Sequence, residues 1–313
     1  MYPFLHLFGH VAASYYVCAA MAGILGFLLA ACTLRKKVPA IWCVALPLLS
    51  VVFAIVGARL LNVLINPKGY GEGFRPWTMS YKNLSLMGGL ALGLLAIVIF
   101  CRIGKLRTLE VLDAFVLPSA CGIVILKVGC FLNGCCGGKD TKMPWGIDFA
   151  RGEKQYLDPF HMIPAAKHIA HPTQLYEILC AVLALVLAMV AGHLLREKRW
   201  IRTGGGASEE SLNESVGTDL DDPPVQAVRV IPGVQAATFA SAFAIGRWIV
   251  LPYRALAYPK YVITTLYPIF YGTIALLGLG FVIGQILRTR RMHAEKGSES
   301  EGQMTPAEKG SGS

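Results

Sequence analysis

The chain has 313 residues, of which 55% are hydrophobic and only 15% are charged, and its mean hydropathy is +0.54. Soluble globular domains are less apolar and more charged, so this composition indicates a protein whose solvent is the lipid bilayer. The net charge of +10 does not indicate nucleic-acid binding, because the Lys and Arg residues form no basic stripe with interleaved aromatics and lie mostly between apolar runs.

Seven apolar stretches come close to the roughly 20 residues that a helix needs to cross the hydrocarbon core. In chain order they cover residues 11–33, 41–65, 84–101, 109–132, 174–195, 235–257 and 265–287. No basic residue precedes the first stretch, so we expect it to remain as a membrane helix rather than to be removed as a signal peptide. The sequence therefore predicts an all-α polytopic membrane protein of about seven transmembrane helices.

Basic clusters lie in alternate links between the predicted helices. They are RKK at 35–37, the group Arg102, Lys105 and Arg107, REKRWIR at 196–202, and RTRR at 288–291. The positive-inside rule places these links in the cytoplasm. An odd number of helices then puts the N-terminus outside and the C-terminus in the cytoplasm.

Residues 1–292 are expected to form one transmembrane domain, interrupted by a disordered cytoplasmic insert at 203–224. That insert is acidic, rich in Gly and Ser and poor in apolar residues, and the tail 293–313 has a similar character. On the opposite side, the links 66–83 and 139–173 contain several aromatic residues and prolines. We expect these two links to form arms or caps at the outer membrane surface.

An ionised group in the middle of the bilayer costs at least ~2.5 kcal/mol, so charged residues within the predicted spans need an explanation. Five of them are singled out here: Arg59, Lys127, Glu177, Arg247 and Arg254. Function is the default explanation, but for Arg59 and Arg254 snorkelling to the interface, or pairing with Glu177, explains them equally well. On the predicted topology, cations at this depth that faced one cavity would suit a phospholipid phosphate. A transporter could use the same charges, but no internal repeat supports one.

The segment KVGCFLNGCCGG at 127–138 ends the fourth predicted span with glycines and an Asn. Such a segment can leave the helix and turn back towards a cavity. A helix cap followed by a loop, with cysteines as small packing residues, is favoured over a vicinal disulfide or a reactive thiol pair at Cys135 and Cys136. The nine cysteines form no zinc-ribbon pattern, so neither a metal nor another cofactor is expected.

The segment HPTQLYE at 171–177 opens the fifth predicted span. A spacing of three places His171, Gln174 and Glu177 on one helical face if the helix begins early enough. A His and a Glu so placed could relay protons or could simply cap the helix. Tyr176 suits an anchor at the membrane interface.

These motifs resemble blocks of the prolipoprotein diacylglyceryl transferase family, in the family's order, from about Tyr16 to Arg254. The blocks are SYYV at 14–17, GARLLNV at 57–63, NLSLMGGLALG at 83–93, KVGCFLNGCCGG, HPTQLYE and GRWIVLPYR at 246–254. HPTQLYE matches the family's HPSQLYE at six of seven positions. The chain departs from the family pattern where Met87 replaces a catalytic histidine, Lys127 an arginine, Cys130 an asparagine, and Cys135 and Leu251 glutamates. It is identified as a divergent member or paralogue.

The resemblance implies a multi-pass enzyme of the plasma (inner) membrane. It would transfer diacylglycerol from phosphatidylglycerol, or a related phospholipid, to the lipobox cysteine in the signal-peptide region of a prolipoprotein, without nucleic acid or a cofactor. The implied catalytic residues are Tyr16, Lys127, His171, Glu177 and Arg247. The implied headgroup-binding residues are Arg59, Lys127, Asn133, Gly134, Gly138, Gln174, Tyr176 and Arg254.

Because Met87 replaces the histidine, the proton of the acceptor thiol needs another destination. His171 or Glu177 would act as the base, or the electrostatic field alone would lower the pKa of the thiol. Two alternatives remain open: a non-catalytic relative that binds or translocates lipid, and a lipid transferase with a different acceptor.

Overall fold

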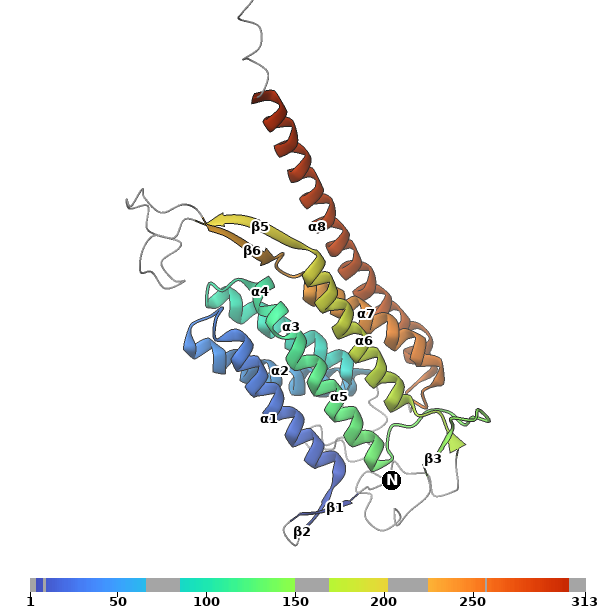
Figure 1. The fold of residues 1–313 in the computed structure, drawn as a ribbon. Helices are drawn as coiled ribbons and strands as arrows, with labels where there is room; N and C mark the ends of the chain where they lie inside the picture. The colour runs from blue at the N-terminus through green and yellow to red at the C-terminus, as the bar shows by residue number, and fades with distance from the viewer. Residues whose placement is uncertain are drawn as a thin grey trace, which may run out of the picture.

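The computed structural model describes residues 4–7, 10–65, 85–149, 169–201, 225–256 and 258–303. Its long helices lie side by side in a bundle (Figure 1). The helices are α1 (Ser14–Leu34), α2 (Ala40–Ile65), α3 (Leu86–Ile103), α4 (Thr108–Ala114), α5 (Val116–Asn133), α6 (Thr173–Leu194), α7 (Val234–Val250) and α8 (Tyr267–Gln303). Among the described residues, six helical segments are long and apolar enough to cross a membrane, and Met87–Ile103 is a shorter apolar helix. The prediction of an all-α polytopic membrane protein is confirmed, whereas the number of spans stays a prediction.

The ends of the chain differ from the predicted boundaries. The first helix begins at Ser14 rather than at residue 11, because β1 (Phe4–Leu7) and β2 (His10–Ala13) pair as an antiparallel hairpin. Helix α8 continues to Gln303 and therefore includes the first part of the tail that was expected to be disordered. The sequence RTRRMHAEK after the apolar stretch consists mainly of good helix formers, which explains this extension.

Several expected segments lie outside the described residues. The acidic insert 203–224 and the end of the tail, 304–313, are among them, as are the link 66–83 and residues 150–168 of the other outer link. The insert is flanked by β5 (Arg196–Ile201) and β6 (Val225–Val230), which pair as an antiparallel hairpin. The sequence had not indicated this hairpin.

The fourth predicted span is broken between α4 and α5 at Phe115. Pro118 lacks the backbone N–H that would otherwise bond to the carbonyl oxygen of Ala114. The Thr33 hydroxyl of α1 donates to that oxygen instead, at 2.9 Å. The carbonyl oxygen that Pro118 leaves without its helical partner is therefore satisfied, and this bond joins α1 to α4.

Helices α2 and α3 approach closely at a pair of glycines. A Cβ atom built on Gly57 would lie 2.3 Å from the carbonyl oxygen of Gly88, and one on Gly88 would lie 2.1 Å from that of Gly57. Neither position accepts a side chain, and small residues at such contacts let membrane helices pack backbone to backbone. This contact places the neighbouring Met87 inside the bundle, where it is 2% exposed.

The buried Asp113 of α4 caps the N-terminus of α7. Its carboxylate oxygens accept hydrogen bonds from the backbone N–H groups of Gly233 at 2.7 Å and Ala236 at 2.8 Å. These N–H groups have no partner within the helix, and they carry the positive end of its dipole. Asp113 was not among the charged residues singled out from the sequence, and its role is structural.

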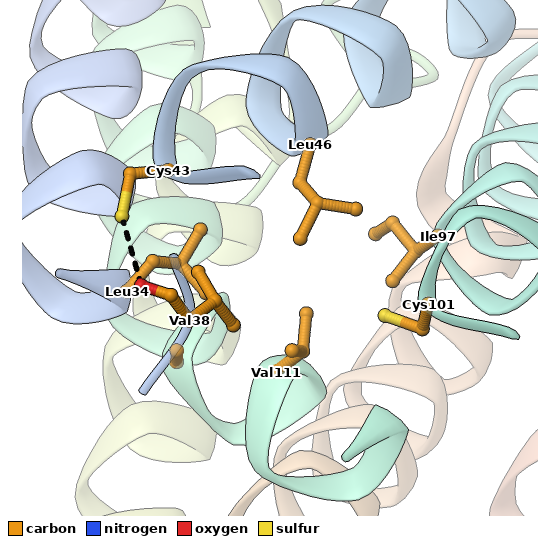
Figure 2. Close-up of a cluster of buried hydrophobic side chains, with 8 residues drawn as sticks. Leu34, Val38, Cys43, Leu46, Ile97, Cys101 and Val111 are labelled. Carbon is orange, nitrogen blue, oxygen red and sulfur yellow. Dashed lines mark hydrogen bonds between the residues drawn. The ribbon is translucent and has the colours of Figure 1, made fainter. Parts of the chain in front are cut away.

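An apolar cluster packs close to the links that carry RKK and Arg102 (Figure 2). It contains Leu34, Val38, Cys43, Leu46, Ile97, Cys101, Val111 and Ala114. Cys101 is fully buried, and the Cys43 thiol lies 3.7 Å from the Val38 carbonyl oxygen. Both cysteines act as small packing residues.

The basic links and the motifs KVGCFLNGCCGG, HPTQLYE and GRWIVLPYR lie at opposite ends of the bundle. Helix α5 ends, α6 begins and α7 ends near the short strands β3 (Ile147–Asp148) and β4 (Ile169–Ala170). The β5–β6 hairpin and the extension of α8 project from the other end (Figure 1). Which end faces the cytoplasm stays a prediction from the positive-inside rule.

Candidate functional site

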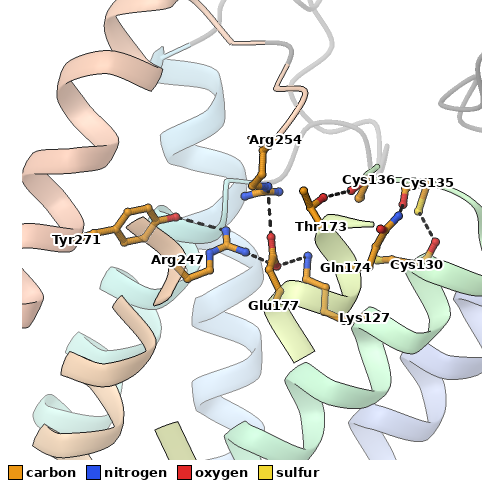
Figure 3. Close-up of polar contacts among 10 residues, drawn as sticks. All are labelled: Lys127, Cys130, Cys135, Cys136, Thr173, Gln174, Glu177, Arg247, Arg254 and Tyr271. Atoms are coloured by element: carbon orange, nitrogen blue, oxygen red, sulfur yellow. Dashed lines mark hydrogen bonds and ion pairs between the residues drawn. The ribbon is translucent and has the colours of Figure 1, made fainter. Parts of the chain in front are cut away.

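Glu177 of α6 lies at the centre of a buried group of charges. Its carboxylate forms ion pairs with Lys127 Nζ of α5 at 2.7 Å and Arg254 Nε at 3.2 Å, and with Arg247 Nη1 of α7 (Figure 3). We call these four residues the cation cluster. Its members come from three parts of the chain, and Glu177 is 1% exposed.

Arg247 is the most deeply buried cation of the cluster. Its side chain is 3% exposed, and Nη2 donates a hydrogen bond to the hydroxyl of Tyr271 at 3.3 Å. The guanidinium carbon also lies 5.9 Å from the centre of the Tyr271 ring, within the range of a cation–π contact. Tyr271 of α8 therefore holds Arg247 in place from the side opposite to Glu177.

The cation cluster has more positive than negative charge. Three cations surround one carboxylate, and the buried Nε of Arg247 has no hydrogen-bond partner among the described residues. The side chains of Lys127 and Arg254 are 18% and 14% exposed, so these two cations can be reached from outside the protein. The arrangement suits an anion that carries several oxygen acceptors.

The segment after α5 leaves the helix in a tight turn. Gly134 has a φ of 71°, a left-handed conformation that favours glycine, and its N–H bonds to the carbonyl oxygen of Phe131 at 3.1 Å. The side chains of Gln174 and Thr173 then donate to the carbonyl oxygens of Cys135, at 2.6 Å, and Cys136, at 3.0 Å. The sequence favoured a helix cap followed by a loop here, and the structure has this cap at Gly134, held by the N-terminus of α6.

Gly138 joins three segments of the site. It forms an antiparallel bridge with Arg254, and its N–H donates to the His171 carbonyl oxygen at 2.8 Å. A Cβ atom here would lie 2.5 Å from the carbonyl oxygen of Tyr253, so the position requires glycine. The bridge fixes the backbone from which Arg254 reaches Glu177.

His171 lies next to the cation cluster but does not share the face of Gln174 and Glu177. Helix α6 begins at Thr173, after His171, so the condition for a shared face is not met. The imidazole Nδ1 is 3.2 Å from the Tyr176 hydroxyl, and its ring centre is 5.0 Å from that of Tyr253. Gln174 and Glu177 do share one buried face of the helix.

Tyr176 belongs to a polar and aromatic group rather than to a single interfacial contact. Its hydroxyl also accepts a hydrogen bond from Trp145 Nε1 at 2.8 Å, and its ring packs edge-on against Tyr253. His171 is half-buried at the edge of this group. His171 therefore packs against Tyr253, the chain neighbour of Arg254.

Two further predicted site residues lie on α1 and α2. Arg59 is half-buried on α2, where it has interactions of its own. Tyr16 is 37% exposed near the start of α1, and it also has interactions of its own. The structure gives neither residue a described contact with Glu177, and their roles stay predictions.

The replacements of the family's histidine and of one glutamate meet in a single apolar cluster. Met87 and Leu251 are 2% and 5% exposed and pack with Ala244, Val262, Tyr267 and Tyr271. A polar group kept at only one of the two positions would be buried mostly among apolar side chains. The two changes are therefore mutually consistent, and neither side chain can act as a base.

The replacements at Cys130 and Cys135 meet in a second cluster, together with Cys136. Their three Sγ atoms lie within 4.8 Å of one another, and none forms a disulfide. Cys130 and Cys135 are buried, whereas Cys136 is exposed. Hydrogen bonds from the other two thiols, aided by the positive charges of Lys127 and Arg254, lower the pKa of the Cys136 thiol. We call these three residues the thiol cluster.

Reasoning from the sequence missed Tyr271, Tyr253 and Cys130 as partners within the site. A usable signal existed for Tyr271, because a tyrosine inside an apolar span needs a partner for its hydroxyl. The spacing of Cys130 to Cys135 resembles no standard metal motif, so the sequence did not suggest that the two thiols meet. They meet because α5 ends between them, at Asn133, and only the fold shows this contact.

The family model for prolipoprotein diacylglyceryl transferase matches residues 3–205. The chain is 30% identical over 167 residues to the phosphatidylglycerol–prolipoprotein diacylglyceryl transferase of Porphyromonas gingivalis, which covers 50% of the chain and 54% of that protein. It is 30% identical over 140 residues to that of Clostridium tetani, with 42% and 49% covered, and 29% identical over 192 residues to that of Parasynechococcus marenigrum, with 60% and 66% covered.

The chain spans about half the length of the first two of these relatives. The family match includes α5 and α6, with Lys127, the thiol cluster and Glu177, and it ends before α7, which carries Arg247. It extends over more than half of the chain and agrees with the order of the motifs. The chain belongs to the prolipoprotein diacylglyceryl transferase family.

Proposed function

We propose that the protein transfers a diacylglyceryl group from phosphatidylglycerol to the cysteine thiol in the signal-peptide region of a prolipoprotein, at the outer face of the plasma (inner) membrane. The observation that carries the proposal is the cation cluster, in which Lys127, Arg247 and Arg254 converge on the buried Glu177. The names of the relatives support the same activity.

The phosphodiester of phosphatidylglycerol has one negative charge, which the positive excess of the cation cluster can neutralise. Lys127 and Arg254 are the partly exposed members, so they would bind the phosphate oxygens directly. Arg247 is buried behind them and adds to the field. Asn133, Gly134 and Gly138 would shape the wall of this headgroup site through the turn that follows α5.

An apolar groove gives the acyl chains a place to lie. It has a volume of about 510 Å³ and lies between the end of α7 and the start of α8. Its lining includes Trp248, Ile249, Leu251 and Ile263, with Lys139 as its one charged residue among those described. Trp248 and Ile249 are 46% and 65% exposed, so a lipid can enter sideways from the bilayer.

In the reaction, the thiolate of the acceptor attacks the glycerol carbon that bears the phosphate ester. A carbon–sulfur bond forms, the carbon–oxygen bond breaks, and glycerol phosphate leaves with the electron pair. Lys127 and Arg254 would stabilise the charge that develops on the departing phosphate. Glu177 is occupied by three cations, so His171 is the better candidate to accept the thiol proton.

A non-catalytic lipid-binding protein is the second candidate. It is favoured by the apolar surroundings of Met87 and Leu251, which remove two polar groups from the site while leaving the cation cluster intact. Such a protein would bind phosphatidylglycerol without breaking its ester bond.

The decisive experiment incubates the protein in vesicles with isotopically labelled phosphatidylglycerol and a lipobox peptide, followed by mass spectrometry. We expect a labelled diacylglyceryl thioether on the peptide cysteine, and at least a ~100-fold lower rate for Arg254→Gln. Arg107→Gln, at an exposed position on the other end of the bundle, is the matched control and should leave the rate unchanged. Absence of product, while a catalytically competent relative works in the same vesicles, would reject the transferase and leave lipid binding.

A further inference from the structure

We propose that Cys130, Cys135 and Cys136 form a binding site for a thiophilic metal ion, best matched by Zn²⁺, whose fourth coordination position accepts the thiol of the acceptor. The second half of this proposal rests on the proposed function, whereas the first half does not. The site coincides with two positions at which the chain departs from its family's residues.

The geometry of the thiol cluster is close to that of a three-thiolate metal site. Tetrahedral Zn²⁺ with bonds of about 2.3 Å holds its sulfur ligands about 3.8 Å apart. The three Sγ atoms already lie within 4.8 Å of one another, so each needs to move by less than about 1 Å. Cys43 and Cys101, which only fill space, share an apolar cluster but belong to no group of three possible metal ligands among the described residues.

The backbone around the thiol cluster is held from outside. The carbonyl oxygens of Cys135 and Cys136 accept hydrogen bonds from Gln174 and Thr173, and the Cys135 N–H donates to the Cys130 carbonyl oxygen at 3.1 Å. Cys136 has a φ of 62°, a left-handed conformation that residues with side chains rarely adopt. Supports of this kind keep ligands aimed at a common point.

The surrounding charge suits a negatively charged metal complex. Zn²⁺ with three thiolates has one net negative charge. Lys127 lies three residues before Cys130 on α5, and Arg254 forms a bridge with Gly138, two residues after Cys136. These residues belong to the cation cluster, which has positive charge in excess. The two buried cysteines and the exposed Cys136 leave one side of the cluster open to a further ligand.

An open position next to the phosphate-binding cations gives the metal a chemical role. The acceptor thiol would pass its proton to His171, and its sulfur would bind the metal as a thiolate. That sulfur then forms the bond to the glycerol carbon, while the carbon–oxygen bond breaks and its electron pair leaves with glycerol phosphate. The thioether product is a weaker ligand and dissociates. A metal would thus take over the activation that is lost where Met87 replaces a histidine.

The first test measures the metal content of protein purified anaerobically without chelators, by mass spectrometry of the dissolved metal. We expect about one Zn²⁺ per chain. The triple variant Cys130→Ser, Cys135→Ser, Cys136→Ser should lose it, and the matched variant Cys32→Ser, Cys121→Ser, with both changes outside the thiol cluster, should keep it. Cys136→Ser alone, at the exposed position, should weaken Zn²⁺ binding at least about tenfold without disturbing packing. Equal metal contents in the wild type and the triple variant, or a disulfide within the cluster, would overturn the site.

The second test replaces Zn²⁺ with Co²⁺, whose thiolate absorption bands report the ligands directly. A lipobox peptide with its cysteine should change these bands, and the same peptide with serine should not. An unchanged spectrum would overturn the fourth-ligand role, as would a transfer rate that survives removal of the metal. Metal binding with no transfer in the vesicle experiment would reject the proposed function and support the metal site.

Discussion

Replacing Glu177 by Gln leaves the size of the side chain nearly unchanged but removes the one negative charge on which Lys127, Arg247 and Arg254 converge. The buried Arg247 would then lose its counter-charge while its Nε still has no hydrogen-bond partner among the described residues. We expect this substitution to be among the most destabilising single changes in the protein.

The expected size follows from the burial of each cation. Leaving one partner of a buried ion pair uncompensated costs about 3–5 kcal/mol, and this applies to Arg247, whose side chain is 3% exposed. Lys127 and Arg254 are 18% and 14% exposed and can turn towards solvent, so each adds less than about 1 kcal/mol. The free energy of unfolding should therefore fall by roughly 3–5 kcal/mol.

The assay is unfolding of the protein in mixed micelles by titration with a denaturing detergent. The control is Glu110→Gln, which removes a carboxylate paired at 3.2 Å with the exposed Arg107, and it should cost less than about 0.5 kcal/mol. Anionic phosphatidylglycerol in the micelles should restore part of the stability of Glu177→Gln, because its phosphate can replace the carboxylate. Zwitterionic phosphatidylcholine should restore less.

A loss below about 1 kcal/mol, or one equal to that of Glu110→Gln, would refute this reasoning. It would mean that Arg247 reaches solvent or another counter-charge when Glu177 is neutral. The cation cluster would then lack the uncompensated positive charge that a phosphate site needs, and the proposed headgroup site would lose its main support.

The remaining predictions concern stability and the geometry of the site. Asp113→Ala should lower the free energy of unfolding by about 1–3 kcal/mol, because buried N–H groups at the start of α7 lose their acceptor, and Asp113→Asn should lose less; detergent titration measures both. Gly138→Ala should cost about 1–3 kcal/mol and slow lipid transfer, since its Cβ would meet backbone atoms at 2.5 Å, whereas Gly122→Ala, with open space around it, should do neither. Tyr271→Phe should lower the free energy of unfolding by about 1 kcal/mol, because Arg247 loses one hydrogen bond. A loss as large as that of Glu177→Gln would mean that Tyr271, and not Glu177, is the main partner of Arg247.

Much of the fold could be predicted because the bilayer imposes a simple requirement on sequence. A span needs about 20 apolar residues whose backbone groups bond within the helix, so hydropathy alone locates where most of the helices lie. The ends of α7 at Val250 and α8 at Gln303 differ from the predicted ends at 257 and 287. The breaks were harder to predict. The interruption at Phe115 depends on Pro118 nearby and also on Thr33 from another helix, and the hairpin β5–β6 lies in a link that is not apolar.

The residues of the candidate site could be predicted from the sequence, but most of their contacts could not. Lys127, Glu177, Arg247 and Arg254 stood out from the sequence because charge is costly within apolar spans. Their pairing with one another was one of several options until the fold brought them together. His171 shows the limit of spacing rules. A spacing of three residues places two side chains on one face only within a helix, and α6 begins at Thr173, after His171.

The sequence by itself determined that this is a helical membrane protein, which family it resembles, and which charged residues need partners in an apolar environment. Those conclusions follow from local composition and order, which hydropathy and motifs record. Only the tertiary structure decided that Met87 and Leu251 share one apolar cluster, and that Cys130, Cys135 and Cys136 share another. The physical reason is that such contacts depend on how the helices pack and where they end. The positions of single residues along the chain do not give the distance between their side chains in the folded protein.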